Sequence, residues 1–127
     1  MQVLLPPGWP RPKGYSNGVA ASGRMVFIAG MIGWDAHGVF HTDDFAGQVR
    51  QALQNVMDVL KESGGKPEHM TWYVTDKREY LAAGREVGAI FRELVGSYNA
   101  AMTAVEVKAL IEDRAKVEIE VTAVVPQ

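Results

Sequence analysis

The chain has 127 residues, and a chain of this length buries roughly two-thirds of the surface that it exposes when unfolded. We therefore predict a single domain over residues 1–127. A formal net charge of −2 argues against nucleic acid as a partner, and the absence of cysteine excludes disulfides, thiolate nucleophiles and cysteine-ligated metals. No apolar run reaches the length of a membrane span, so we expect no membrane partner and a cytoplasmic location.

The N-terminal segment is dominated by residues that break regular structure. Residues 6–18 hold four prolines and three glycines, which predicts an extended arm that lies against the rest of the domain. Residues 19–23 and 25–30 follow as a predicted β-hairpin. The second of these strands is a nearly continuous apolar run, which is typical of a strand buried on both faces.

Two helices are predicted in the middle of the chain. Asp43 or Asp44 can cap the first, which ends at Ser63-Gly64-Gly65. Its apolar positions recur at spacings of four and three: Phe45, Val49, Leu53, Val56 and Leu60. After a short β-type run at 70–74, Asp76 and Glu79 have the spacing of a capping box. The second helix then runs to Gly96, with its inward side formed by Leu81, Val87, Ile90 or Phe91, and Leu94.

The C-terminal part alternates apolar and polar residues. Residues 102–107 and 116–123 are predicted to form an antiparallel hairpin around a turn at 112–115. The order ββ, α, β, α, ββ predicts an α+β fold in which two helices cover one face of a mixed two-layer β-sheet. The other face is left uncovered, and association with further copies of the chain is the usual way to cover such a face.

The C-terminal segments resemble the Rid family, the reactive intermediate deaminases, which are also called YjgF-like or endoribonuclease L-PSP proteins. Family members typically read Pro-Ala-Arg-Ser-x-Val-Glu-Val, then a turn, then Ile-Glu-Ile-Glu-Ala. Residues 14–18 are similar to the family's Gly-Pro-Tyr-x-x-Gly arm, and residues 29–32 correspond to its Ser-Gly-Gln-Ile. The resemblance implies the YjgF/chorismate-mutase-like fold, a homotrimer and a small-molecule ligand in a cleft between subunits. It also implies deamination without a cofactor.

Two residues decide what this resemblance implies for chemistry. Glu120 matches the glutamate that positions or activates the attacking water, although an exposed strand glutamate is more often simply solvated. Met102 stands where the family has an arginine that clamps the substrate carboxylate, a bidentate contact that methionine cannot reproduce. Met102 is therefore either an apolar wall of the cleft or plain packing.

Further cleft residues follow from the same resemblance. Tyr15 lines the cleft, either donating a hydrogen bond or packing, and Asn99 lies at the rim. Ala29 replaces the family's serine, and Gly30 allows a ligand to approach the backbone. Trp34 and Trp72 fill core or interface space, or bring an aromatic surface close to Met102 that suits an unsaturated or ring-derived ligand.

Three functions are open at this point. The first is a cofactor-independent enamine or imine deaminase, with aminomuconate-like compounds as one substrate class. The second is a non-catalytic trimeric protein that binds a small molecule in the same cleft. The third is a ribonuclease, which the missing basic surface argues against. His37, His41 and His69 lack metal-ligand spacing, so we expect no metal.

Overall fold

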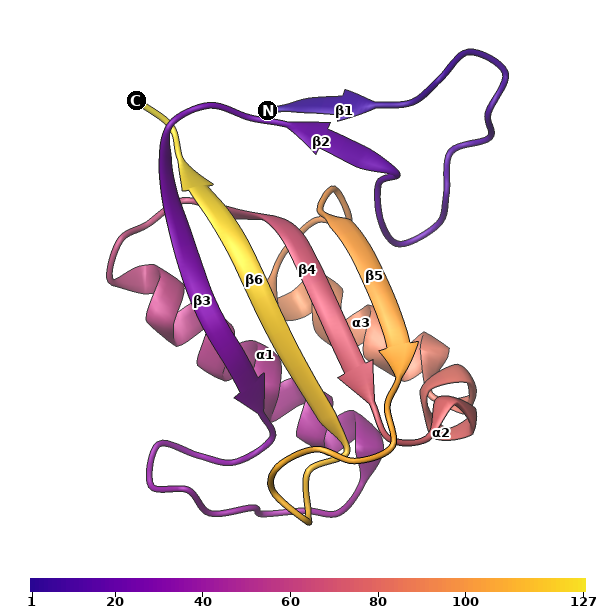
Figure 1. Ribbon diagram of the computed structural model, residues 1–127, viewed down its shortest axis with the longest axis vertical. Coiled ribbons are helices and arrows are strands. Elements are labelled where there is room, and N and C mark those ends of the chain that lie inside the picture. The colour runs from indigo at the N-terminus through magenta and orange to yellow at the C-terminus, as the bar shows by residue number, and fades with distance from the viewer.

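A four-stranded sheet with helices on one face forms the body of the protein (Figure 1). The computed structural model describes residues 1–127. Along the chain the elements are β1 (Gln2–Leu4), β2 (Gly18–Ala20), β3 (Arg24–Ile32), α1 (Phe45–Lys61), β4 (Lys66–Val74), α2 (Lys77–Ala82), α3 (Gly84–Leu94), β5 (Ala101–Glu106) and β6 (Val117–Val125). The predicted α+β class, a mixed sheet with its helices in a second layer, is confirmed.

The strand order of the main sheet is β3-β6-β4-β5. β6 pairs antiparallel with both β3 and β4, whereas β5 lies at the edge and pairs parallel with β4. The predicted C-terminal hairpin is therefore wrong: β4 separates β5 from β6. Residues 107–116 cross the end of β4 instead of turning tightly, and alternation along a strand does not reveal its neighbour.

The predicted N-terminal hairpin is wrong for the same reason. β2 pairs antiparallel with β1, with Val19 opposite Val3, and these two strands form a separate ribbon. Gly23, at a φ of 144°, lies between β2 and β3, and a Cβ at this position would come within 2.2 Å of the Val125 carbonyl oxygen. The chain can therefore turn from the ribbon into the main sheet only because residue 23 has no side chain.

Helix α1 agrees with the prediction. The Asp44 side chain caps it by accepting a hydrogen bond from the Gly47 amide at 2.9 Å, and Gly64 follows its end with a φ of 76°. All five predicted apolar positions are buried. The helix therefore packs on the sheet through the stripe that its 3.6-residue period defines.

The second predicted helix is two helices. Asp76 caps α2, but the helix is interrupted at Ala83 and α3 begins at Gly84. The break changes the phase of the apolar stripe, so Leu81 is 69% exposed and its predicted inward position is wrong. On α3, the buried residues are Val87, Ile90 and Phe91.

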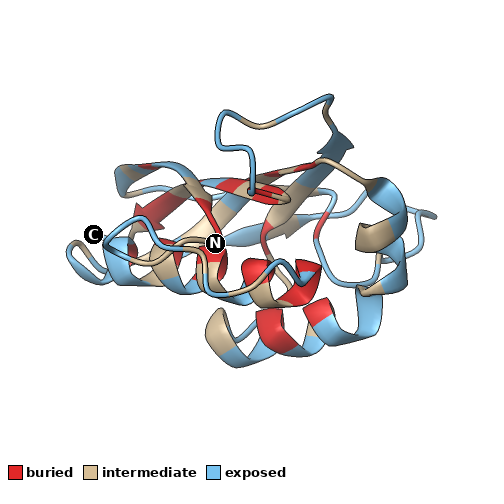
Figure 2. Cartoon of the chain, turned by 90° about the horizontal axis from the view of Figure 1, so that it is seen from below, coloured by how far each residue is buried: buried red, intermediate tan, exposed pale blue.

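The hydrophobic core lies between the helices and one face of the sheet, and Figure 2 shows buried positions where these layers meet. Alternate residues of β6 point into it: Val117, Ile119, Val121 and Ala123. The opposite face carries no helix. It exposes Phe27 at 74% and Met25 at 57%, which is unusual for such large apolar side chains.

A buried glutamine joins three separate segments beneath the sheet. Gln48 of α1 is fully buried, and its side-chain amide donates to the carbonyl oxygens of Thr42 (3.2 Å) and Arg114 (2.9 Å). Its Oε1 accepts from the backbone amide of Lys116 at 2.8 Å. A Cβ on Gly33 would lie 2.6 Å from the Cβ of Gln48, so residue 33 leaves room for this side chain.

Candidate functional site

Glu120 lies on the face of the sheet that the helices do not cover. It is exposed on β6, and its Oε1 accepts a hydrogen bond from the Tyr73 hydroxyl at 2.5 Å. Because the hydroxyl is held by this carboxylate, the pKa of Tyr73 is raised. The hydrogen bond orients the Glu120 carboxylate, and Oε2 has no partner within the chain. A fixed carboxylate with one free oxygen is suited to binding and activating a water molecule.

A bulge in β3 lies close to this carboxylate. The pairing of β3 with β6 shifts between Ile28 and Met31, so Ala29 and Gly30 form the irregular stretch, and both are exposed. A Cβ on Gly30 would lie 2.2 Å from Oε2 of Glu118. The lack of a side chain at Gly30 therefore leaves space for Glu118. The bulge also leaves backbone hydrogen-bonding groups of β3 without a partner in the sheet, so a ligand can contact them.

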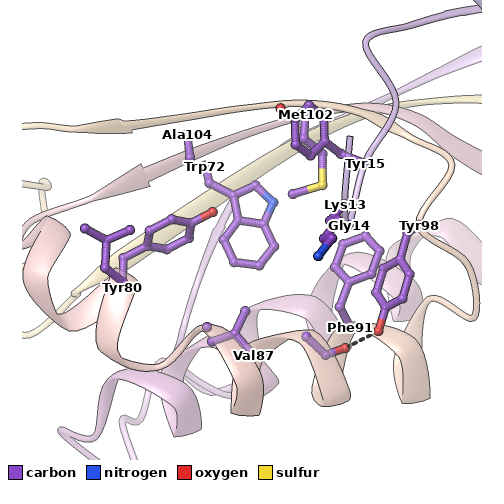
Figure 3. Close-up of a pocket in the computed structure, with 13 residues that line it drawn as sticks. Lys13, Gly14, Tyr15, Trp72, Tyr80, Val87, Phe91, Tyr98, Met102 and Ala104 are labelled. Atoms are coloured by element: carbon purple, nitrogen blue, oxygen red, sulfur yellow. Dashed lines mark hydrogen bonds between the residues drawn. The ribbon is translucent and has the colours of Figure 1, made fainter. Parts of the chain in front are cut away.

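A cavity of about 440 Å³ lies on the other side of the sheet, between the edge strand β5 and the helices α2 and α3 (Figure 3). Nine of its 13 lining residues are hydrophobic. The rings of Trp72, Tyr80, Phe91 and Tyr98 give it an aromatic wall, and Met102 and Tyr15 cover it from the side of β5. A cavity of this size and character suits a small ligand with an apolar body.

The pairing of β5 with β4 explains why Met102 reaches this cavity. Met102 is opposite Met70, and Ala104 is opposite Trp72, so all four side chains share the helix face of the sheet. Glu120 is on the opposite face. Within one chain, Met102 and Glu120 therefore do not face a common space.

The predicted hairpin would make the strands of Met102 and Glu120 direct neighbours. In the structure β4 lies between these two strands. Arg114 does not line the aromatic cavity, and its side chain is engaged elsewhere. Its guanidinium binds Asp43 at 3.0 Å and lies over the ring of Phe40, 5.3 Å from the ring centroid. Its role in the chain is to hold the 107–116 connection against the start of α1.

The N-terminal arm is fastened alongside β5. The Ser16 amide donates to the Ala100 carbonyl at 3.0 Å, and this contact places Tyr15 at the cavity. Asn99 is held by Arg11, whose Nη2 donates to Oδ1 at 3.1 Å. Asn99 lines a neighbouring hollow that it shares with Tyr15, and it does not reach the Met102 cavity.

The expected site residues thus form two groups. Glu120, Ala29 and Gly30 belong to the open face, and Tyr15 and Met102 belong to the aromatic cavity. Asn99 lies in the neighbouring hollow. Of the two tryptophans, Trp72 lines the cavity, whereas Trp34 packs against Phe40 at 5.8 Å between ring centroids.

Sequence reasoning missed Tyr73 and Lys13. Tyr73 touches Glu120 only because β4 is the neighbour of β6, and no local pattern predicts that pairing. Lys13 lines the aromatic cavity from the arm, in a segment whose path cannot be read from its prolines and glycines.

The ring of His41 has a local carboxylate partner. The Asp35 carboxylate receives hydrogen bonds from the His41 ring at 2.7 Å and from the backbone amides of His37 and Val39, and these bonds lower the pKa of Asp35 to about 2. No group of three or more His, Asp or Glu side chains is arranged to hold a metal ion. No helix has the combination of length and apolar character needed to cross a bilayer.

The fold and the match of residues 10–125 to the endoribonuclease L-PSP family model define the class: the chain belongs to this family, which includes the Rid and YjgF proteins. It is 34% identical to a RutC family protein of Aquifex aeolicus, over 98% of this chain and 99% of the relative. It is 25% identical to the 3-aminoacrylate deaminase RutC of Acinetobacter baylyi, over 72% of this chain and 76% of the relative.

Solved structures agree with this assignment. The Rid-family protein YyfB of Yersinia pestis, described as a protein of unknown function, superposes with a TM-score of 0.84 at 29% identity, and the match covers 98% of both chains.

Proposed function

We propose that this protein is a cofactor-independent deaminase that hydrolyses a small enamine or imine in a cleft between subunits. The observation that carries the proposal is the Glu120 carboxylate, held by Tyr73 on an exposed sheet face with one oxygen free. A relative named as a 3-aminoacrylate deaminase supports the reaction class.

The chemistry needs only a positioned acid–base group. Glu120 accepts a proton from water while the water oxygen bonds to the imine carbon, and it returns that proton to nitrogen to give a carbinolamine. It then takes the proton of the new hydroxyl and delivers it to the amine. The C–N bond breaks, a carbonyl forms and ammonia leaves with the carboxylate regenerated. An enamine first tautomerises to the imine: its β-carbon gains a proton and its nitrogen loses one.

A homotrimer is part of this proposal, because it would bring the open face of one subunit to the aromatic cavity of the next. Exposed Phe27 and Met25 give that face an apolar surface for association. We expect light scattering at micromolar concentration to report three times the 13.9 kDa chain mass. A stable monomer would contradict the shared cleft. We also propose a single domain and a cytoplasmic location.

The test of function is the acceleration of imine hydrolysis above its spontaneous rate. Imines made in situ by an amino-acid oxidase from alanine, leucine and phenylalanine offer side chains of increasing size. We expect faster ammonia release from the larger imines and little effect on the smallest, because Met102 provides apolar contact and no carboxylate clamp.

Met102 also favours the second candidate, a trimeric protein that binds a small molecule without converting it. In that case the same compounds would raise the melting temperature, while ammonia would form at the spontaneous rate. That combination would reject the deaminase.

A further inference from the structure

One buried polar group of the aromatic cavity has no hydrogen-bond partner. Trp72 is only 1% exposed, and its indole nitrogen makes no hydrogen bond. An indole N–H can only donate, and a buried donor without an acceptor is costly and uncommon in native proteins. Figure 3 shows this nitrogen on the side of the ring that faces Met102, at the cavity.

The Met102 side chain lines the cavity and can change its rotamer. A methionine side chain is unbranched, with three rotatable bonds, and adapts to its surroundings at low cost. Its thioether lies between the indole nitrogen and Tyr15 in Figure 3. A ligand that displaces this thioether would reach the Trp72 N–H and could accept its hydrogen bond.

Lys13 supplies the charge. It is the one charged residue of the cavity lining, which contains no aspartate or glutamate, and it forms no ion pair within the chain. Figure 3 shows its ammonium directed to the cavity. A cationic group beside aromatic walls selects a ligand that is anionic at one end and apolar along its body.

We infer that the cavity binds a planar, unsaturated carboxylate, whose carboxylate oxygens pair with the Lys13 ammonium and accept the hydrogen bond of Trp72 Nε1. Its flat body packs on the rings of Trp72 and Phe91, whose centroids are 6.3 Å apart. Lys13 thus takes the charge-recognition role that Met102 cannot fill. The inference rests on the proposed function because it names the ligand class of one wall of the proposed cleft.

The probe is sorbate (2,4-hexadienoate), titrated into the intact protein by calorimetry. Two comparison compounds separate the contribution of the charge from that of the unsaturated chain. 2,4-Hexadien-1-ol has the same chain without the charge, and propionate has the charge without the unsaturated chain. We expect sorbate to bind at least tenfold more tightly than either. Equal affinity for propionate or for the alcohol would overturn the inference.

Variants test the two donors. Lys13→Gln should weaken sorbate binding about fivefold, as expected for a partly exposed ion pair, and leave the alcohol unchanged. Lys61→Gln, on the last turn of α1, is the matched control and should change neither. Equal losses in both variants would show a general charge effect and overturn the inference. Trp72→Phe, if it folds, should weaken sorbate binding severalfold while keeping an aromatic wall.

Binding and turnover separate this inference from the proposed reaction. Lys13-dependent sorbate binding without accelerated ammonia release would reject the deaminase and keep the ligand class. If ammonia release is accelerated but Lys13→Gln does not change the affinity for sorbate, the deaminase proposal stands and the proposed ligand class is overturned.

Discussion

Glu120→Gln should slow catalysed ammonia release about 10²- to 10⁴-fold, the usual effect of removing a positioned acid–base group. Glutamine keeps the size of the side chain and can still accept the Tyr73 hydrogen bond, so the melting temperature should stay within about 2 °C. The measurement is ammonia release from the best imine of the panel, with circular dichroism to check folding.

Two neighbours provide controls for this variant. Glu118→Gln changes a glutamate two residues away on the same face of β6, and activity should remain close to that of the wild type. Tyr73→Phe removes the hydrogen bond that orients the carboxylate, so a smaller loss of rate is expected. Full turnover by Glu120→Gln would show that Glu120 is a structural residue and that water is activated elsewhere.

Gln48→Leu should lower the free energy of unfolding by about 2–4 kcal/mol. Leucine is similar in volume but leaves the Lys116 amide and the carbonyl oxygens of Thr42 and Arg114 without their partner. Because these groups are partly buried at the junction, water replaces the lost hydrogen bonds poorly. Urea unfolding should show a lower midpoint with an unchanged slope.

Gln54→Leu is the matched control on the same helix. Gln54 is exposed and bonds only to Asp58, one turn further along, so its loss should cost less than about 0.5 kcal/mol. If both variants had the same midpoint, the junction would be held together by packing and not by the glutamine.

Local signals predicted α1 well. Its cap, its glycine stop and its apolar period act within a few residues, and tertiary packing agreed with them. The second helix shows the limit of this approach. Its apolar period fits a continuous helix through this region, and only the structure shows that the helix is interrupted at Ala83 and that Leu81 points outwards.

Strand partners could not be predicted in the same way. Alternation correctly placed Glu120 on the polar face of β6, because that depends on parity alone. The side on which Met102 emerges depends on which strand β5 joins and in which direction, and its parallel pairing with β4 decides this. The predicted hairpin makes the strands of Met102 and Glu120 neighbours, whereas the structure places the two side chains on opposite faces of the sheet.

The central position of β6 has a consequence for biosynthesis. β3 and β4 have no direct pairing and meet only through β6. While residues 117–125 are still inside the ribosome, the nascent chain has α1, β3 and β4, but β3 and β4 cannot join into one sheet for α1 to pack on. The apolar faces of β3 and β4 stay exposed during that time, when pairing with other chains competes with folding. Cooperative folding of this domain should begin only after its last strand emerges.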